Sequence, residues 1–110
     1  MQITVESAAP AIGTIVTLHG KLDVVSNADV EKSLLDVIAL GEMKLVIDCA
    51  ALDFISSAGL RSLIMAIKHM KVRGGVIALV ALKRDVKMII EISGLSPLIK
   101  IYATRADALA

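Results

Sequence analysis

Residues 45–71 read LVIDCAALDFISSAGLRSLIMAIKHMK, an apolar strand that leads into an amphipathic helix. Residues 45–47 lack polar alternation, which is typical of a central strand covered on both faces. Residues 48–55 are predicted to form the loop that leaves this strand. The helix is predicted to begin at Ser56-Ser57-Ala58-Gly59 and to end at Gly74-Gly75. Its apolar stripe consists of Leu60, Leu63, Ile64 and Ile67, with Arg61, Ser62 and Lys68 away from the stripe.

The residues before this segment predict two strands and a helix. Residues 2–6 alternate polar and apolar side chains, and residues 14–19 form a second strand pattern. A turn is predicted at Ala8-Ala9-Pro10 and Gly13, and this short connection favours an antiparallel pair. Residues 20–23 are expected to form a loop before a helix that Ser26 or Asn27 caps and Gly41 ends. The predicted buried stripe of that helix is Ala28, Leu34, Leu35 and Ile38.

The C-terminal part continues the alternation of strands and helices. Residues 76–82 predict a second central strand, residues 85–92 a short helix and residues 99–102 a last strand, and Thr104 caps a terminal helix that begins at Arg105. The chain thus reads as two strands, a helix and a strand repeated three times, and a final helix. The predicted class is therefore α/β, with a mostly parallel mixed sheet of about five strands and about four helices. Residues 1–110 are expected to form one domain.

Composition argues against several classes of function. Lys and Arg number 12 against 11 Asp and Glu, and this net charge of +1 provides no field for nucleic acid or anionic lipid. The longest apolar run, residues 76–82, is far shorter than the ~20 residues of a membrane span, so no membrane insertion is expected. His19, His69 and Cys49 show no metal-ligand spacing, so no metal and no cofactor are expected. The single cysteine and the lack of a basic, apolar leader predict a cytoplasmic protein.

The candidate functional segment is the helix start that carries Ser56 and Ser57. It follows a predicted central strand, and partners of α/β folds tend to bind beyond the carboxyl ends of the parallel strands. A helix N-terminus exposes unpaired N–H groups and about half a positive charge, so a phosphate on a serine there is stabilised. Such a phosphate would add a charge of about −1.5 to −2 and create a second electrostatic state. The alternative is structural: a serine acts only as the N-cap, and Ala58 and Gly59 are small because strand and helix approach closely.

The same segment, together with GKLDVVSNADVEKSLLDVI upstream, resembles the STAS domain family, specifically its stand-alone anti-sigma factor antagonists. The resemblance covers nearly the whole chain, including the ending Glu91-Ile92-Ser93-Gly94-Leu95. It implies a partner-switching protein that is not an enzyme and whose unphosphorylated form binds an anti-sigma factor, a serine-protein kinase of ATPase fold, or a related regulator. The kinase phosphorylates one serine at the helix start and breaks the complex, and a PP2C-type serine phosphatase restores it.

The resemblance assigns roles to individual residues. Family members often read D-S-S-G-L or D-S-T-G-L, where this chain reads Ser56-Ser57-Ala58-Gly59-Leu60, so Ser56 replaces the acidic residue and Ala58 the second hydroxyl. Ser57 keeps the hydroxyl in register and is the predicted phosphorylation site, with Ser56 as the alternative. Asp23 of the G-x-L-D loop matches a position near that serine, although a turn Asp that bonds its own backbone is equally compatible. Asp53 is expected to serve the structure of its loop. The predicted partner-binding residues are Asp23, Ser56, Ser57, Ala58, Gly59 and Arg61.

Two other functions compete with this interpretation. One is a STAS-like subunit of a membrane transport complex without a phosphorylation switch, which predicts partner binding that is insensitive to Ser57→Asp. The other is a serine hydrolase that uses Ser57, but the sequence shows no G-x-S-x-G elbow and no evident general base. The paired hydroxyls at the helix start favour the switch.

Overall fold

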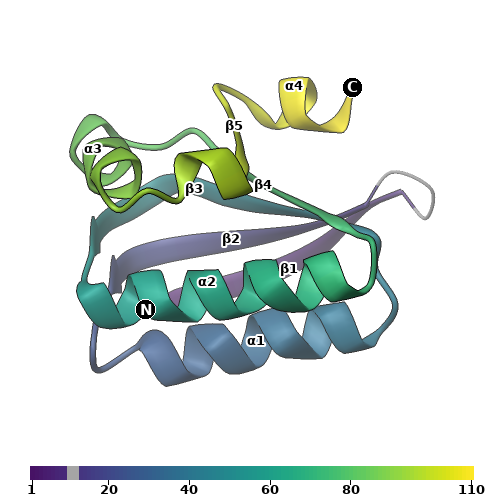
Figure 1. The fold of residues 1–110 in the computed structure, drawn as a ribbon, viewed down its shortest axis with the longest axis horizontal. Helices are drawn as coiled ribbons and strands as arrows, with labels where there is room; N and C mark the ends of the chain where they lie inside the picture. Colours follow the sequence, from purple (N-terminus) through teal and green to yellow (C-terminus); the bar gives the residue numbers. More distant parts are fainter. Residues whose placement is uncertain (10–12) are drawn as a thin grey trace.

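The protein is built around a five-stranded sheet with helices on both of its faces (Figure 1). A computed structural model describes residues 1–9 and 13–110. In chain order the elements are β1 (Gln2–Ala9), β2 (Gly13–Leu22), α1 (Asn27–Ala39), β3 (Lys44–Ile55), α2 (Ser57–Val72), β4 (Val76–Val80), α3 (Arg84–Ile92), the short 3-10 helix η1 (Ser96–Leu98), β5 (Lys100–Tyr102) and α4 (Arg105–Leu109).

Strands follow one another across the sheet in the order β1-β2-β3-β4-β5. β1 runs antiparallel to β2, while β2–β3, β3–β4 and β4–β5 are parallel pairs. Parallel neighbours require a crossover, and helices supply it: α1 and α2 lie side by side on one face of the sheet (Figure 1). The predicted α/β class with a mixed, mostly parallel sheet is confirmed.

The central strand β3 is longer than predicted. The expected loop at residues 48–55 is wrong, because β3 continues to Ile55, and the expected loop at residues 20–23 is wrong because β2 continues to Leu22. The second half of β3 pairs with β2 alone, since the pairing with β4 ends at Asp48. Two register shifts in the β2–β3 pairing accommodate the irregular spacing of its buried residues, Cys49, Leu52 and Ile55. Of the predicted first turn, Pro10 lies outside the described residues, and β1 continues to Ala9.

The main core lies between the sheet and helices α1 and α2. The buried stripe of α1 is Val30, Leu34, Val37 and Ile38. The predicted burial of Ala28 is wrong: it is exposed, because two positions before Val30 correspond to about 200° around a helix. Ser62 of α2, predicted outside the apolar stripe, is buried against α1. Its hydroxyl lies 3.3 Å from both a Glu31 carboxylate oxygen and the Ala58 carbonyl, which explains how a polar side chain is tolerated there.

A smaller apolar cluster lies on the opposite face of the sheet, where α4 packs on β3 and β4. Arg105, the first residue of α4, donates to the Asp48 carboxylate at 2.5 Å. The same guanidinium donates to the Thr17 hydroxyl at 2.9 Å and to the Glu6 carboxylate at 3.3 Å. Thr104 is the N-cap of α4, as predicted. One side chain therefore ties the last helix to β1, β2 and β3.

Candidate functional site

The candidate site lies at the carboxyl-terminal edge of the parallel strands. Three connections meet there: the β2–α1 loop, the junction of β3 with α2, and the β4–α3 loop. The Ser56 backbone N–H donates to the Leu22 carbonyl at 2.9 Å, which fixes the start of α2 against the end of β2. The serines are thus presented by a continuous strand and helix, with no flexible loop between them.

Ser56 is the N-cap of α2. Its backbone is extended, with φ −94° and ψ 174°, and its hydroxyl accepts a hydrogen bond from the Gly59 N–H at 3.2 Å. This bond satisfies one of the unpaired donors at the helix start. The structural interpretation therefore holds for Ser56.

Ser57 is the first residue of α2, and its side chain is exposed. Within residues 1–9 and 13–110, no hydrogen bond engages its hydroxyl. The two serines, equivalent in sequence, are thus different in structure: one hydroxyl is used by the helix and the other is available to an incoming group.

Packing against the end of β2 explains the glycine at position 59. A Cβ atom at this position would lie 2.6 Å from Leu22 Cγ and 2.8 Å from the Leu22 carbonyl oxygen. Ala58 is half-buried one position earlier. Close approach of α2 to β2 therefore accounts for the small residue at 59, and neither residue offers a polar side chain to a partner.

Asp23 shapes the loop between β2 and α1. Its carboxylate accepts hydrogen bonds from the Val25 N–H at 3.0 Å and the Ser26 N–H at 3.1 Å. The hydrogen bond from Ser26 is the main cause that lowers the pKa of Asp23 from its ordinary value of 3.8. Asp23 therefore bonds its own loop backbone, which the sequence had left as one of two interpretations. Its second carboxylate oxygen accepts no hydrogen bond from the described residues. Ser26 reinforces the loop, because its hydroxyl donates to the Lys21 carbonyl at 2.7 Å.

Asp53 is an exposed residue of β3 that pairs with Lys83, just before α3. The hydrogen bond and the charge of Lys83 lower the pKa of Asp53. Since Asp53 lies in a strand, its expected role in a loop is wrong; it links β3 to the approach of α3. Its charge is also locally compensated, so it contributes little negative potential at the serine end.

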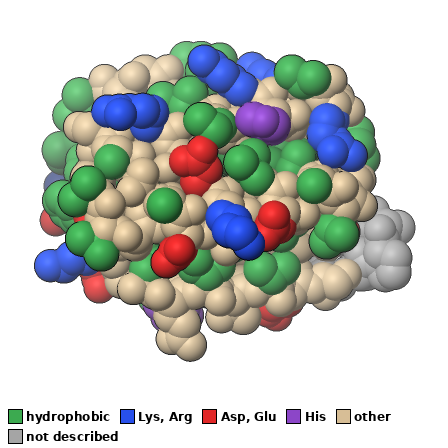
Figure 2. All heavy atoms as spheres, turned by 90° about the horizontal axis from the view of Figure 1, so that it is seen from below, with side chains coloured by type: hydrophobic (Ala, Val, Ile, Leu, Met, Phe, Trp, Pro, Cys, Tyr) green, Lys and Arg blue, Asp and Glu red, His purple; other side chains and the backbone are tan. Residues whose placement is uncertain are grey.

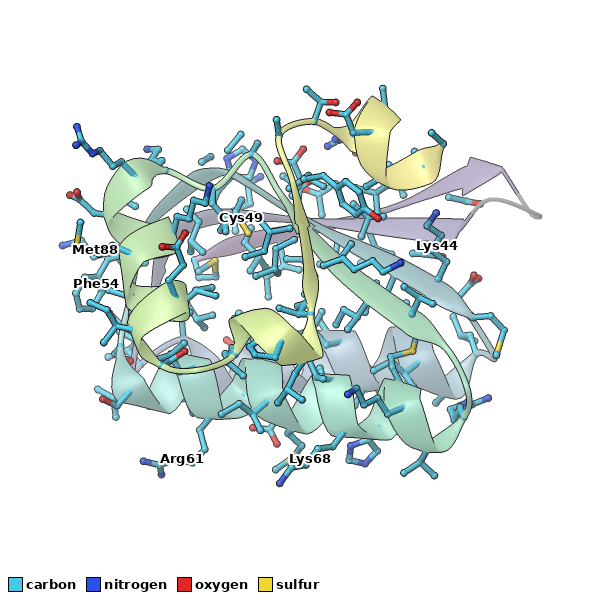
Figure 3. The ribbon with its side chains drawn as sticks, turned by 45° about the horizontal axis from the view of Figure 1, so that its top comes forward. Lys44, Cys49, Phe54, Arg61, Lys68 and Met88 are labelled. Carbon is cyan, nitrogen blue, oxygen red and sulfur yellow. The ribbon has the colours of Figure 1, made fainter. Side chains whose placement is uncertain are left out.

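Apolar side chains surround the serine end, and sequence reasoning missed them. Val24 and Val25 in the β2–α1 loop are 77% and 86% exposed. Phe54 of β3 and Met88 of α3 are also exposed and lie at the same end of the molecule (Figure 3). The adjacent valines in a short loop are the one signal that the sequence offered. Exposed apolar groups that gather at one end of a protein are typical of a protein-binding surface.

Arg61 lies one helical turn beyond Ser57 on the exposed side of α2 (Figure 3). It forms no ion pair within the described residues. Of the predicted site residues, the structure thus brings Ser56, Ser57, Ala58, Gly59 and Arg61 together on one helix start, with Asp23 on the neighbouring loop.

The described residues include no group of three or more His, Cys, Asp or Glu side chains that could hold a metal ion. Burial raises the pKa of the Cys49 thiol to about 12, so it is not a candidate nucleophile. Among the helices described, none is both long and apolar enough to cross a bilayer.

Residues 2–108 match the family model of the STAS domain. BtrV of Bordetella bronchiseptica, provisionally named an anti-sigma factor antagonist, is 32% identical over 96 residues, covering 87% of this chain and 83% of the relative. The crystal structure of an anti-sigma factor antagonist from Mycobacterium paratuberculosis is similar with a TM-score of 0.84 and 27% identity, over 98% of this chain and 92% of the other. The anti-sigma factor antagonist SpoIIAA, in its unphosphorylated form, has a TM-score of 0.81 and covers 97% and 92% of the two chains, but at 18% identity it shows the shared fold alone.

Proposed function

The chain belongs to the STAS domain family, and we propose that it is an anti-sigma factor antagonist that works by partner switching. Its unphosphorylated form binds an anti-sigma factor that is a serine-protein kinase of ATPase fold, or a related regulator. Phosphorylation of Ser57 releases the regulator, and a PP2C-type serine phosphatase restores the binding form. In this scheme the protein has no catalytic activity of its own and acts in the cytoplasm.

The observation that carries this proposal is the different state of the two serine hydroxyls. Ser56 Oγ accepts from the Gly59 N–H, whereas Ser57 Oγ is exposed and unbonded within the described residues. A kinase needs a hydroxyl that can approach the γ-phosphate in line, and only Ser57 offers one without breaking a helix cap. Ser57 is therefore the preferred acceptor and Ser56 the alternative.

The surroundings of Ser57 favour a large effect of one phosphate on binding. The phosphate would sit at the positive end of the α2 dipole, which stabilises it in the free protein. In a complex it would be placed among apolar groups such as Val25 and Phe54, where desolvation of about −1.5 to −2 charges is unfavourable. Charge conflicts at an interface cost several kcal/mol, and 1.4 kcal/mol is about tenfold in affinity.

The test is to incubate the protein with its cognate kinase and ATP and to map the phosphate by mass spectrometry. Ser57→Ala is expected to abolish labelling and to keep regulator binding, whereas Ser57→Asp is expected to weaken binding. Ser56→Ala is the matched control: it removes the neighbouring hydroxyl and the cap but should still be labelled. Labelling that survives Ser57→Ala and disappears in Ser56→Ala would move the assignment to Ser56.

A different outcome would support the transport-complex alternative. If no kinase encoded with the protein labels either serine, and the protein binds an ATPase or permease equally well as the wild type and as Ser57→Asp, the switch is refuted.

A further inference from the structure

A concave surface lies between helices α1 and α2, at the opposite end of α2 from Ser57. It is a groove of about 610 Å³. Leu35 and Ile38 of α1 and Val72 of α2 form its apolar part, and Lys68, His69 and Arg73 lie along the α2 side. Figure 2 shows this helical face, where apolar side chains lie among basic and acidic ones.

Some apolar side chains that line the groove are exposed to solvent instead of packed in the core. Val72, which lines the groove, is 89% exposed. Leu35 is only half-buried although it lies between the two helices. Contiguous exposed apolar groups bordered by charges mark interaction surfaces in soluble proteins.

The charges along the groove are not balanced within the chain. α2 contains no Asp or Glu, and Lys68, Lys71 and Arg73 form no ion pairs within the described residues. Across the groove, Asp36 is already paired with Lys32 at 3.4 Å. The C-termini of α1 and α2 contribute about half a negative charge each, and Glu42 in the α1–β3 loop adds one carboxylate. The three cations Lys68, Lys71 and Arg73 outweigh these charges, so the α2 side of the groove is net positive.

The groove is confined to the C-terminal parts of the two helices. It takes residues 35–39 of α1 and 68–73 at the end of α2, roughly 6–8 Å along the helix axes. A neighbouring hollow of about 410 Å³ shares Leu35 with it but is lined by α1 residues alone, among them Glu31 and Asp36, so it does not extend the cationic groove. The side-chain ridges of a third helix fit such a groove between two packed helices.

We propose that this groove binds an amphipathic helix of a partner protein. The apolar side chains of that helix would pack against Leu35 and Val72, and its acidic side chains would pair with Lys68 and Arg73. Apolar anchors spaced at i, i+3, i+4 and i+7 are the usual means by which a helix occupies such a groove. Lys68 lies 11 positions beyond Ser57 on α2, roughly 16 Å along the helix axis. This contact is therefore separate from the serine end and independent of the phosphorylation state.

The test uses a designed 14-residue helical peptide with leucines at the anchor spacing and glutamates on its flanks, titrated into isotope-labelled protein and followed by NMR. Chemical-shift changes are expected at Leu35, Ile38 and Val72. The double variant Lys68→Glu/Arg73→Glu is expected to bind about tenfold more weakly. Val72→Ser, which replaces an exposed apolar side chain without adding a charge, is also expected to weaken binding and tests the apolar contact separately.

Matched controls separate specific docking from general charge attraction. Lys21→Glu/Lys100→Glu reverses two exposed cations away from the groove and should leave the affinity unchanged, as should Ser57→Asp. No binding, equal binding of a peptide with lysines in place of glutamates, or equal weakening by the control variant would overturn the proposal. So would occupation of the groove by a second copy of the chain, seen as a dimer by sedimentation, or shift changes located outside α1 and α2.

Discussion

Gly59→Ala is expected to destabilise the protein, although alanine is the better helix former. The added Cβ would lie 2.6 Å from Leu22 Cγ, 2.8 Å from the Leu22 carbonyl oxygen and 3.2 Å from Ile55 Cγ1. Carbon atoms pack best at about 3.5–4.0 Å, so the nearest contact is roughly 1 Å too short. Leu22 and Ile55 are both buried, and the Leu22 carbonyl is held by the Ser56 N–H, so neither neighbour can simply turn away.

The magnitude follows from two opposing effects. Overpacking a buried site costs about 1–3 kcal/mol. Replacing glycine by alanine in a helix interior gains at most about 1 kcal/mol, and less in the first turn. The expected net loss in the free energy of unfolding is therefore about 1–2 kcal/mol.

Urea denaturation measures this loss as a lower midpoint with an unchanged m-value. Ser57→Ala is the control, because an exposed side chain without contacts changes stability by less than about 0.5 kcal/mol. A Gly59→Ala variant as stable as the wild type would refute the close approach of α2 to β2 as the reason for the glycine.

Three further predictions concern residues away from the serines. Arg105→Leu leaves the largely buried Asp48 carboxylate without its cation and should lower stability by about 1–3 kcal/mol in thermal denaturation, with partial recovery in Arg105→Leu/Asp48→Asn; equal stability of Arg105→Leu and wild type would contradict the ion pair. Cys49, with its pKa raised to about 12, should react with a thiol reagent at pH 8 only after urea is added, and fast labelling of the native protein would refute its burial. Folding lowers the pKa of Asp23, so its contribution to the free energy of unfolding is present above its ordinary pKa and is lost as the pH falls through the folded value. Asp23→Asn should therefore make the stability fall less steeply at acid pH. An unchanged pH dependence would count against the hydrogen bonds of this loop.

The element order was predictable because the periodicities are distinct. The helical spacing that begins at Leu60 and the uninterrupted apolar run at residues 76–82 have few alternative interpretations. The second half of β3 was not predictable, because its Asp, Cys and Ala residues resemble a loop and gain strand structure only by pairing with β2. Ser62 was misplaced for a similar reason: its burial depends on acceptors that α1 brings from 31 to 35 residues away.

The sequence identified the helix start that carries the two serines, but the different environments of the two hydroxyls are visible only in the structure. Ser56 and Ser57 are equally good N-cap residues by type, and the backbone angles at the end of β3 decide which one caps. The exposure of Phe54 could not be foreseen, because an apolar residue in a strand is expected to be buried, and only the packing shows that no neighbour covers it. For Val24 and Val25 the sequence offered only their place in a short loop.

The guanidinium that joins the first strand to the last helix also bears on folding kinetics. Arg105 and Glu6 are 99 positions apart, and closing so long a loop costs roughly 4 kcal/mol of chain entropy before any contact compensates. We therefore expect α4 to dock after the sheet has formed, so that Arg105→Leu accelerates unfolding far more than it slows refolding. Brief detachment of this helix would uncover Ile15 and Val46 and make that face of the sheet the place where self-association begins when the protein is stressed.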